Sequence, residues 1–346
     1  MVRKINHFCT LSEVYLIAEI GVNHNGDLTL AKKMIESAKK NGADAVKFQT
    51  FAADLLVSPE TQKVEYQKQS GPKSETHYEM IKKLELSAKQ HYELFDFCNQ
   101  LGIDFLSTPY DLDSAKFLNK LGVKYFKTAS ADIIDLPLLK YIASTGKPTI
   151  IATGMSSLGE IERAVEVFEN CNNLDFILLH CVSNYPCSDS SLNMRVMRSL
   201  EGSFNCSVGY SDHSVGFLAS VIAVSLGAKV IEKHFTLDKM SPGPDHMASS
   251  TPEELFELSS NIRKAEIMLG SSRKKIQDEE IQMSRVSRKT LVASREIKIG
   301  DLIQIDDISL MRTDGGISAT FMDNVIGRRA TANILRNKKI QWSSLS

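Results

Sequence analysis

Two histidines lie at or near the ends of apolar, β-prone runs of the sequence. The run 207–213 reads SVGYSDH and ends at His213, and the run 230–237 reads VIEKHFTL and contains His234. Titratable side chains are rarely buried without a partner, so these residues are expected either to reach solvent or to bind a ligand or another side chain. Neutral imidazoles combined with carboxylate or water bind divalent metals of the Mn²⁺, Mg²⁺, Co²⁺ or Zn²⁺ type. If the two runs are adjacent strands, the imidazoles converge on one metal; a structural, hydrogen-bonded role for each histidine is the alternative.

Two lysines and a glutamate occupy comparable places. Lys47 lies in AVKFQT (45–50), Lys127 in YFKTAS (125–130) and Glu19 in YLIAEIG (15–21). Ammonium groups mixed with hydroxyl groups suit a phosphate or carboxylate ligand, although each lysine could instead neutralise a buried carboxylate. Glu19 is a candidate metal ligand or general acid and base, or the partner of a lysine. The hydroxyl groups come from Thr108, Ser130, Thr153, Ser183 and Ser211.

Eight β-rich runs must position these residues, and amphipathic helical segments separate the runs. Alternating strands and helices indicate parallel strands with helical crossovers. Eight units fit a (β/α)8 TIM barrel better than an open sheet, which usually has fewer strands and carries a glycine-rich dinucleotide turn that is missing here. The runs are 15–21, 45–50, 104–109, 125–130, 148–154, 176–183, 207–213 and 230–237. Barrel active sites lie at the carboxyl ends of the strands, so the polar residues are expected at one mouth.

Alternation along 230–237 separates its three charged or titratable residues. Successive strand side chains point to opposite faces, so Glu232 and His234 share one face and Lys233 takes the other. With His234 inward as a metal ligand, we expect Glu232 to point into the barrel one layer deeper. Lys233 is then expected to face the surrounding helices.

The remaining segments suggest a second domain and a cover over the mouth. The connection 51–87 is far longer than an ordinary βα loop and is interpreted as a partly helical flap, with a surface excursion as the alternative. We predict a barrel domain at 1–270, a charged linker at 271–285 and a small β-rich domain at 286–346. The core of that small domain is thin, so we expect it to dock on a barrel.

Composition limits the function classes. A net charge of −1 over 346 residues argues against a general nucleic-acid or membrane binder. The six cysteines form no CxxC pair, so reduced thiols are expected, and Cys181 is interpreted as a small buried side chain rather than a catalytic thiol. No signal-peptide pattern or run of eighteen apolar residues occurs, which predicts a cytoplasmic protein.

Motifs in fixed order resemble the sialic acid synthase family over nearly the whole chain. They are AEIGVNHNG (18–26), KFQT (47–50), FLSTP (105–109), ATGM (152–155), HCVSNYP (180–186), GYSDH (209–213), EKHFTLD (232–238) and GPDHMAS (243–249). Residues 286–345 resemble the family's antifreeze-like, or SAF, domain. The resemblance implies a transferase that condenses phosphoenolpyruvate with N-acetylmannosamine, with C–O cleavage, to give N-acetylneuraminate and phosphate.

The resemblance also implies roles for individual residues. His213 and His234 would bind the divalent metal, Mn²⁺ first with Mg²⁺ or Co²⁺ possible, and Glu19 would act as acid and base beside them; no organic cofactor is implied. The implied phosphoenolpyruvate pocket is Lys47, Thr108, Lys127, Ser130, Ser183 and Ser211. The implied amino-sugar side is Gln49, Asp132, Tyr185, Asp245 and Arg312. Arg312 would come from the partner's C-terminal domain, which implies a domain-swapped homodimer.

Departures from the family pattern leave the sugar open. ASAD places Asp132 where many members have a glutamate, Ala152 replaces a hydroxyl residue, and RTDGG adds Asp314 beside Arg312. Synthases of legionaminic or pseudaminic acid, which use a 2,4-diacetamido-trideoxyhexose, are therefore close alternatives. More distant alternatives are an octulosonate or heptulosonate synthase, against which the C-terminal domain argues, and a non-catalytic sugar-binding protein.

Overall fold

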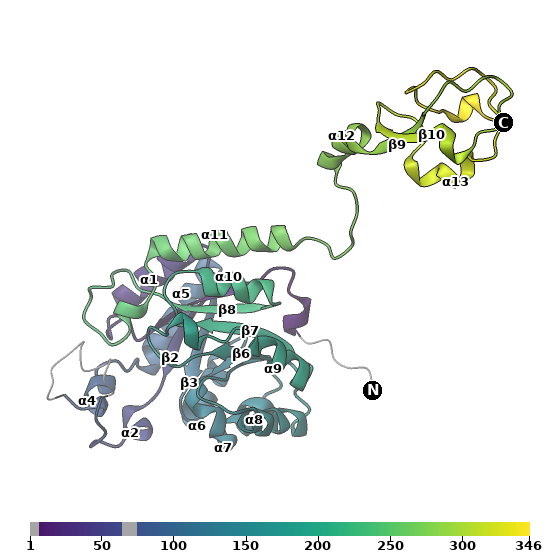
Figure 1. Cartoon of the computed structure of the whole chain (residues 1–346). Coiled ribbons are helices and arrows are strands. Elements are labelled where there is room, and N and C mark those ends of the chain that lie inside the picture. The colour runs from purple at the N-terminus through teal and green to yellow at the C-terminus, as the bar shows by residue number, and fades with distance from the viewer. Residues whose placement is uncertain (1–6, 64–74) are drawn as a thin grey trace. The chain divides into compact units, whose positions relative to one another are not determined.

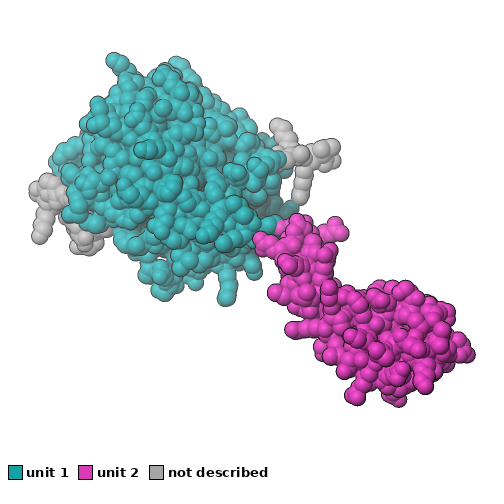
Figure 2. All heavy atoms as spheres, turned by 90° about the horizontal axis from the view of Figure 1, so that it is seen from above, with its two compact units in different colours: residues 1–270 teal, residues 271–346 magenta. Residues whose placement is uncertain are grey.

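The computed structural model describes residues 7–63 and 75–346. The chain divides into two compact units, residues 1–270 and 271–346, coloured separately in Figure 2. Each unit has its own hydrophobic core and is described by itself.

Eight parallel strands form the first unit's sheet in the order β3-β2-β1-β8-β7-β6-β5-β4 (Figure 1). β3 and β4 contact each other, so the sheet closes into the expected TIM barrel. The strands are β1 (Tyr15–Gly21), β2 (Ala45–Thr50), β3 (Asp104–Pro109), β4 (Phe126–Thr128), β5 (Thr149–Ala152), β6 (Phe176–Cys181), β7 (Ser207–Asp212) and β8 (Val230–His234). Glu19 on β1 is the register partner of His234 on β8. Ser211 on β7 is the register partner of Glu232, which lies two residues before His234 and therefore one layer deeper in the barrel.

Helices connect the strands. They are α1 (Leu28–Lys40), α5 (Ala88–Leu101), α6 (Leu112–Leu121), α7 (Leu136–Ser144), α8 (Leu158–Asn170), α9 (Val196–Phe204), α10 (Leu218–Ser225) and α11 (Pro252–Leu269). Ser157 and Glu160 form a capping box at the start of α8, and Gly102 ends α5 in a left-handed conformation that glycine adopts without strain. Of the described residues, no helix combines the length and the apolar character needed to cross a membrane.

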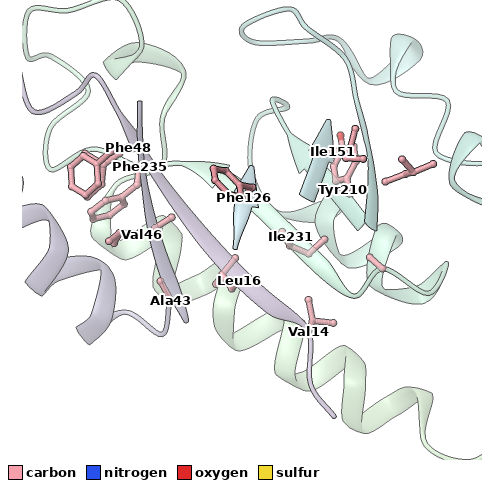
Figure 3. Packing of buried hydrophobic residues seen from close by; sticks show 14 of the residues in the cluster. Val14, Leu16, Ala43, Val46, Phe48, Phe126, Ile151, Tyr210, Ile231 and Phe235 are labelled. Carbon is pink, nitrogen blue, oxygen red and sulfur yellow. The ribbon is translucent and has the colours of Figure 1, made fainter. Parts of the chain in front are cut away.

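Strand alternation divides the core into two layers. Leu16, Val46 and Ile231 point outward and pack under the helices, as Figure 3 shows. Ile17, Ala45 and other inward residues fill the bottom of the barrel in a separate cluster. The bottom is therefore closed by apolar side chains, and polar residues are left for the opposite mouth.

The fourth strand is shorter than expected. β4 ends at Thr128, and residues 130–134 form the 3-10 helix η2 (Ser130–Ile134) where the sequence suggested that the strand continues to 130. Other 3-10 helices are η1 (His7–Thr10), η3 (Asp189–Ser191) and η4 (His246–Ala248). The turn into η2 brings Ser130 and Asp132 to the mouth from a segment that no longer alternates like a strand.

The described parts of the expected flap are partly helical. They contain α2 (Ala53–Leu56) and α4 (His77–Lys82), which contact each other. Residues 64–74, which fall within the flap predicted from the sequence, lie outside the described residues. A small, separate apolar cluster packs α2 and α4 against Val22 and Phe51, which directly follow β1 and β2.

The second unit is small and rich in turns. It contains α12 (Asp278–Ser287), β9 (Lys289–Ala293), β10 (Ile308–Arg312), α13 (Met322–Val325) and the 3-10 helices η5 (Ile305–Asp307), η6 (Ala319–Phe321) and η7 (Trp342–Ser344). β9 and β10 pair antiparallel around a core that includes Leu291, Ile303 and Ile340. No residue of α12 is buried, consistent with a charged segment that has no apolar face.

Candidate active site

A cavity of about 540 Å³ opens at the carboxyl ends of the barrel strands. Almost every residue that the sequence suggested for the site lines this cavity. They are Glu19, Lys47, Gln49, Thr108, Lys127, Ser130, Asp132, Ser183, Tyr185, Ser211, His213, His234 and Asp245. The parallel strands deliver these side chains to one place because their carboxyl ends share one edge of the sheet.

Four buried charges form the floor of the cavity. Lys47 Nζ lies 2.8 Å from Glu19 Oε2 and 3.7 Å from Glu232 Oε2, and Lys127 Nζ lies 3.6 Å from Glu232 Oε1. Ser211 Oγ donates a hydrogen bond to Glu232 Oε1 at 2.9 Å. The lysines thus have carboxylate partners, as the alternative interpretation required, and Glu232 points inward as alternation predicts.

The two carboxyl groups differ in their electrostatic surroundings. Burial raises the pKa of Glu19 to about 7, although the ammonium of Lys47 acts in the opposite direction. Burial also acts to raise the pKa of Glu232, but Lys127 and Lys47 outweigh it and hold that pKa below its usual range. Glu232 is therefore the permanent anion of the floor, and Glu19 is the carboxyl group that accepts a proton more easily.

The two histidines at the cavity differ in their hydrogen bonds, and both keep a ring nitrogen for a ligand. His213 Nδ1 lies 2.7 Å from the carbonyl oxygen of Val182, so Nδ1 carries the proton and Nε2 keeps its lone pair. Nδ1 of His234 is buried, has no hydrogen-bond partner and lies 3.9 Å from Asp245 Oδ2. Burial lowers the pKa of both imidazoles, which keeps them neutral.

These two imidazoles fit a divalent metal that also takes ligands from water or substrate. Their ring centroids are 5.6 Å apart, which allows both rings to approach one ion. Among residues 7–63 and 75–346, no group of three or more histidine, cysteine, aspartate and glutamate side chains is close enough to hold a metal. A divalent metal held by these two imidazoles would take its remaining ligands from water or substrate.

Hydroxyl and amide groups gather beside Lys127. Gly154 N donates to Ser130 Oγ at 3.0 Å, and Ser130 Oγ lies 3.1 Å from Cys181 Sγ. A Cβ atom on Gly154 would lie 2.3 Å from Ser183 Oγ, so only glycine leaves this cradle open. The role of Gly154 was missed from the sequence, although the ATGM motif contains it.

Thr153 and Cys181 lie in the same region of the barrel, and neither offers a reactive group to the cavity. Thr153 was expected to offer its hydroxyl to the pocket, but the hydroxyl donates to Leu179 O at 2.9 Å and Thr153 does not line the cavity, so that expectation was wrong. Burial raises the pKa of the Cys181 thiol, which fits a small buried side chain better than a nucleophile. All six cysteines are free.

Two acidic groups line the cavity outside the floor. Asp132 Oδ2 is buried without a hydrogen-bond partner, and burial together with Asp135 raises the pKa of Asp132 to about 7. Burial raises the pKa of Asp245 to about 6 against the attraction of Lys47. Tyr110, which sequence reasoning missed, lines the cavity directly after β3. Buried acceptors of this kind are suited to polar groups of a ligand.

Two predicted residues lie away from this cavity. Lys233 faces outward, where its ammonium lies 3.1 Å from Asp212 Oδ2, as alternation predicts. Arg312 is exposed on β10 of the second unit, so its part in the site stays a prediction.

Comparisons with known proteins agree on one family. The model described as the NeuB family matches residues 34–274, and the SAF domain model matches residues 288–346. The chain is 45% identical to the N,N'-diacetyllegionaminic acid synthase of Legionella pneumophila, covering 96% of this chain and 94% of that protein. It is 44% identical to the Campylobacter jejuni protein of the same name, and the match covers 96% of this chain and 100% of that protein.

More distant relatives carry other names. The N-acetylneuraminate-9-phosphate synthase of Homo sapiens is 35% identical, with 92% of this chain and 89% of that protein covered. The crystal structure of N-acetylneuraminic acid synthetase from Leptospira borgpetersenii superposes with a TM-score of 0.71 at 34% identity, covering 78% of this chain and 90% of that chain.

Proposed function

Because this chain belongs to the NeuB family, we propose that it condenses phosphoenolpyruvate with a 2,4-diacetamido-2,4,6-trideoxyhexose to give N,N'-diacetyllegionaminic acid and phosphate. The chain is a phosphoenolpyruvate-dependent nonulosonate synthase, a transferase that forms a carbon–carbon bond. The N-acetylmannosamine substrate expected from the motifs is supported only at family level. Two relatives at 44–45% identity are N,N'-diacetyllegionaminic acid synthases, whereas a pseudaminic acid synthase is 34% identical.

The observation that supports catalysis most directly is one cavity holding a lysine and hydroxyl cluster, a proton-accepting glutamate and two neutral histidines. In the proposed reaction, C3 of phosphoenolpyruvate forms a bond to the sugar aldehyde carbon, and the aldehyde oxygen gains a proton. Water adds at C2, the C2–O bond to phosphate breaks, and phosphate leaves with the bridging oxygen as the C2 carbonyl forms.

Lys47, Lys127 and the hydroxyl cluster would bind the phosphate and carboxylate groups of phosphoenolpyruvate. The phosphate needs several donors as well as positive charge, and the hydroxyl groups of Thr108, Ser130 and Ser183 line the same cavity. Glu232 would keep both ammonium groups in position from below.

Glu19 would move the protons. It is held between Lys47 and the amide of Gln49, which donates to Glu19 Oε1 at 3.3 Å. A carboxyl group that exchanges protons near neutral pH can donate to the alkoxide that forms from the aldehyde and accept from the attacking water. A divalent metal bound by His213 and His234, Mn²⁺ being the first candidate, would supply Lewis-acid polarisation of the aldehyde oxygen.

A homodimer that exchanges its second units completes the proposal, with Arg312 of one copy reaching the sugar on the other. Exposed apolar side chains on the second unit, including Met311 beside Arg312, Phe321 and Trp342, support contact with another surface.

A sugar panel tests the proposed function. Purified full-length protein with phosphoenolpyruvate and Mn²⁺ is given the two 2,4-diacetamido-trideoxyhexoses that precede legionaminic and pseudaminic acid, N-acetylmannosamine, its 6-phosphate, and arabinose 5-phosphate. We expect the highest kcat/KM for phosphate release with the diacetamido sugar that precedes legionaminic acid. Its product should have the mass of N,N'-diacetyllegionaminic acid. Preference for another sugar would overturn the substrate assignment, and phosphate release with none would favour a binding protein.

A further inference from the structure

One wall of the cavity is apolar and comes mainly from the segments that contain α2 and α4. Figure 1 labels these two short helices. The side chains of the wall belong to the separate hydrophobic cluster that joins these two short helices. Those that line the cavity are Val22, Phe51, Leu56, Val57, Met80, Ile81, Leu84 and Tyr110. Among the described residues, the polar groups on this wall are the imidazole of His77 and the hydroxyl of Tyr110, and burial lowers the pKa of His77, which favours its neutral form.

Lysines on and around α2 and α4 form ion pairs with carboxylates from the same part of the chain. Lys82 pairs with Asp54 and Glu85, and both Lys63 and Lys83 pair with Glu75. Among the described residues that line the cavity, the lysines and arginines are Lys47 and Lys127, both on the strands. As far as the described residues go, the cavity therefore has a charged floor and an apolar wall that carries neither a cation nor a carboxylate.

We propose that this apolar wall, residues 51–57 and 80–84 with Val22 and Tyr110, binds the C6 methyl end of the sugar and selects a 6-deoxy substrate. This inference rests on the proposed function. The aldehyde at C1 must meet phosphoenolpyruvate over the charged floor, which leaves C6, the far end of the carbon chain, to reach a different surface. The acetamido groups carry N–H and C=O groups that need hydrogen bonds, and the polar residues Gln49, Asp132 and Asp245 can supply them.

The wall distinguishes three substituents at C6. A methyl group gains by leaving water for an apolar surface. A hydroxyl group at the same position loses its water partners, and the described residues of the wall offer only His77 and the Tyr110 hydroxyl in their place. A phosphate meets the same wall without a cation among its described residues, so a 6-phosphate sugar is excluded more strongly than a 6-hydroxy sugar.

The test uses two sugars that differ only at C6. These are the 2,4-diacetamido-2,4,6-trideoxyhexose and the 2,4-diacetamido-2,4-dideoxyhexose of the same configuration, each assayed by phosphate release with the full-length protein. We expect kcat/KM of the wild-type protein to favour the 6-deoxy sugar by about 10- to 100-fold, the range in which apolar pockets discriminate such groups.

Adjacent residues of α2 provide a matched pair of variants. Leu56 lines the cavity, whereas the side chain of Leu55 is 63% exposed and does not line it. Leu56→Asn places a hydrogen-bonding group on the wall and should reduce the preference severalfold, and Leu55→Asn should leave it unchanged. Val57→Thr adds a hydroxyl at nearly constant volume and decides the question if Leu56→Asn does not fold.

The outcomes separate the two proposals. Equal use of both diacetamido sugars by the wild-type protein would overturn the role of the wall while the proposed function stands. An equal shift in Leu55→Asn and Leu56→Asn would do the same. Turnover of N-acetylmannosamine with neither diacetamido sugar would overturn the proposed function, and with it the inference that depends on it.

Discussion

Glu232 connects the two lysines of the cavity floor at the scale of single residues. Its carboxylate lies within 3.7 Å of both ammonium groups and accepts from Ser211. Removal of one partner from a buried charge network leaves an uncompensated charge, which is strongly destabilising. Glu232 therefore holds both lysines of the cavity floor in place.

His234 is expected to be needed for metal binding. His234→Asn should weaken Mn²⁺ binding at least about 100-fold in titration calorimetry, because it removes one of two imidazole ligands. His180→Asn is the matched control, since His180 also lies on a strand near its carboxyl end but bonds to the carbonyl of Leu192 at 2.6 Å. Unchanged Mn²⁺ affinity in His234→Asn would contradict the metal assignment.

Because of Asp132, the free energy of unfolding is expected to fall as pH rises. Its folded-state pKa of about 7 lies above the value of 3.8 for a free aspartate, so folding favours the protonated form. This favourable contribution is complete below about pH 4 and is lost as pH rises to about 7. Asp132→Asn, which stays neutral, should therefore be more stable than the wild-type protein at pH 8 by on the order of 4 kcal/mol, measured relative to the difference between the two proteins at pH 4.

Chemical denaturation at several pH values measures that difference. Asp113→Asn, at a side chain that is 76% exposed, serves as the control and should have little effect at any pH. A stability difference for Asp132→Asn that does not change between pH 4 and pH 8 would show that burial of this carboxyl group is not the cause.

Two loops that carry site residues are tied together at the scale of elements. Asn23, after β1, donates to the carbonyl of Phe235 and to Ser249 Oγ, both at 2.9 Å. Ser249 Oγ in turn donates to the backbone carbonyl of Asp245 at 2.6 Å. The loop after β8 thus depends on a hydrogen-bond chain that begins in the loop after β1, and this chain positions Asp245.

Loss of this chain should affect the sugar more than phosphoenolpyruvate. Ser249→Ala is expected to raise KM for the sugar about 3- to 10-fold, the worth of one hydrogen bond, with KM for phosphoenolpyruvate unchanged. Ser249→Thr should restore the sugar KM because it keeps the hydroxyl, and Ser241→Ala in the same loop is the control. An equal rise in both KM values would indicate a general disturbance of the site instead.

At the scale of the whole molecule, the prediction concerns exchange of the second units between copies. If Arg312 acts on the partner's cavity, Arg312→Ala and His234→Asn proteins are each inactive, but a mixed dimer contains one complete site. Subunit exchange in an equal mixture should then restore about a quarter of wild-type activity, because half of the dimers are mixed and each has one working site.

Sedimentation and activity measurements on the mixture provide the check. The mixture of Arg312→Ala with a second Arg312→Ala preparation is the control and should stay inactive. A monomeric protein, or a mixture that gains no activity, would contradict the exchanged dimer and the role of Arg312 in the partner's site.

The sequence by itself determined the barrel and the place of its mouth. Periodicity is a local property, so eight apolar runs with intervening amphipathic helices identify parallel strands, and the period of two along 230–237 separates inward Glu232 and His234 from outward Lys233. Resemblance to the family identified the same strand-end residues. The end of β4 was misjudged because nothing in YFKTAS marks the turn into the 3-10 helix at Ser130.

Only the tertiary structure decided which groups meet across the barrel. The pairing of Lys47 with Glu19 and of Lys127 with Glu232, the hydroxyl of Thr153 bonded to Leu179, and the approach of Gly154 to Ser183 depend on closure of the sheet. The apolar wall depends on α2 and α4 folding over the mouth from a segment without strand periodicity. Distances between residues far apart in the chain follow from packing, and a local pattern fixes a side chain's face but not its partner.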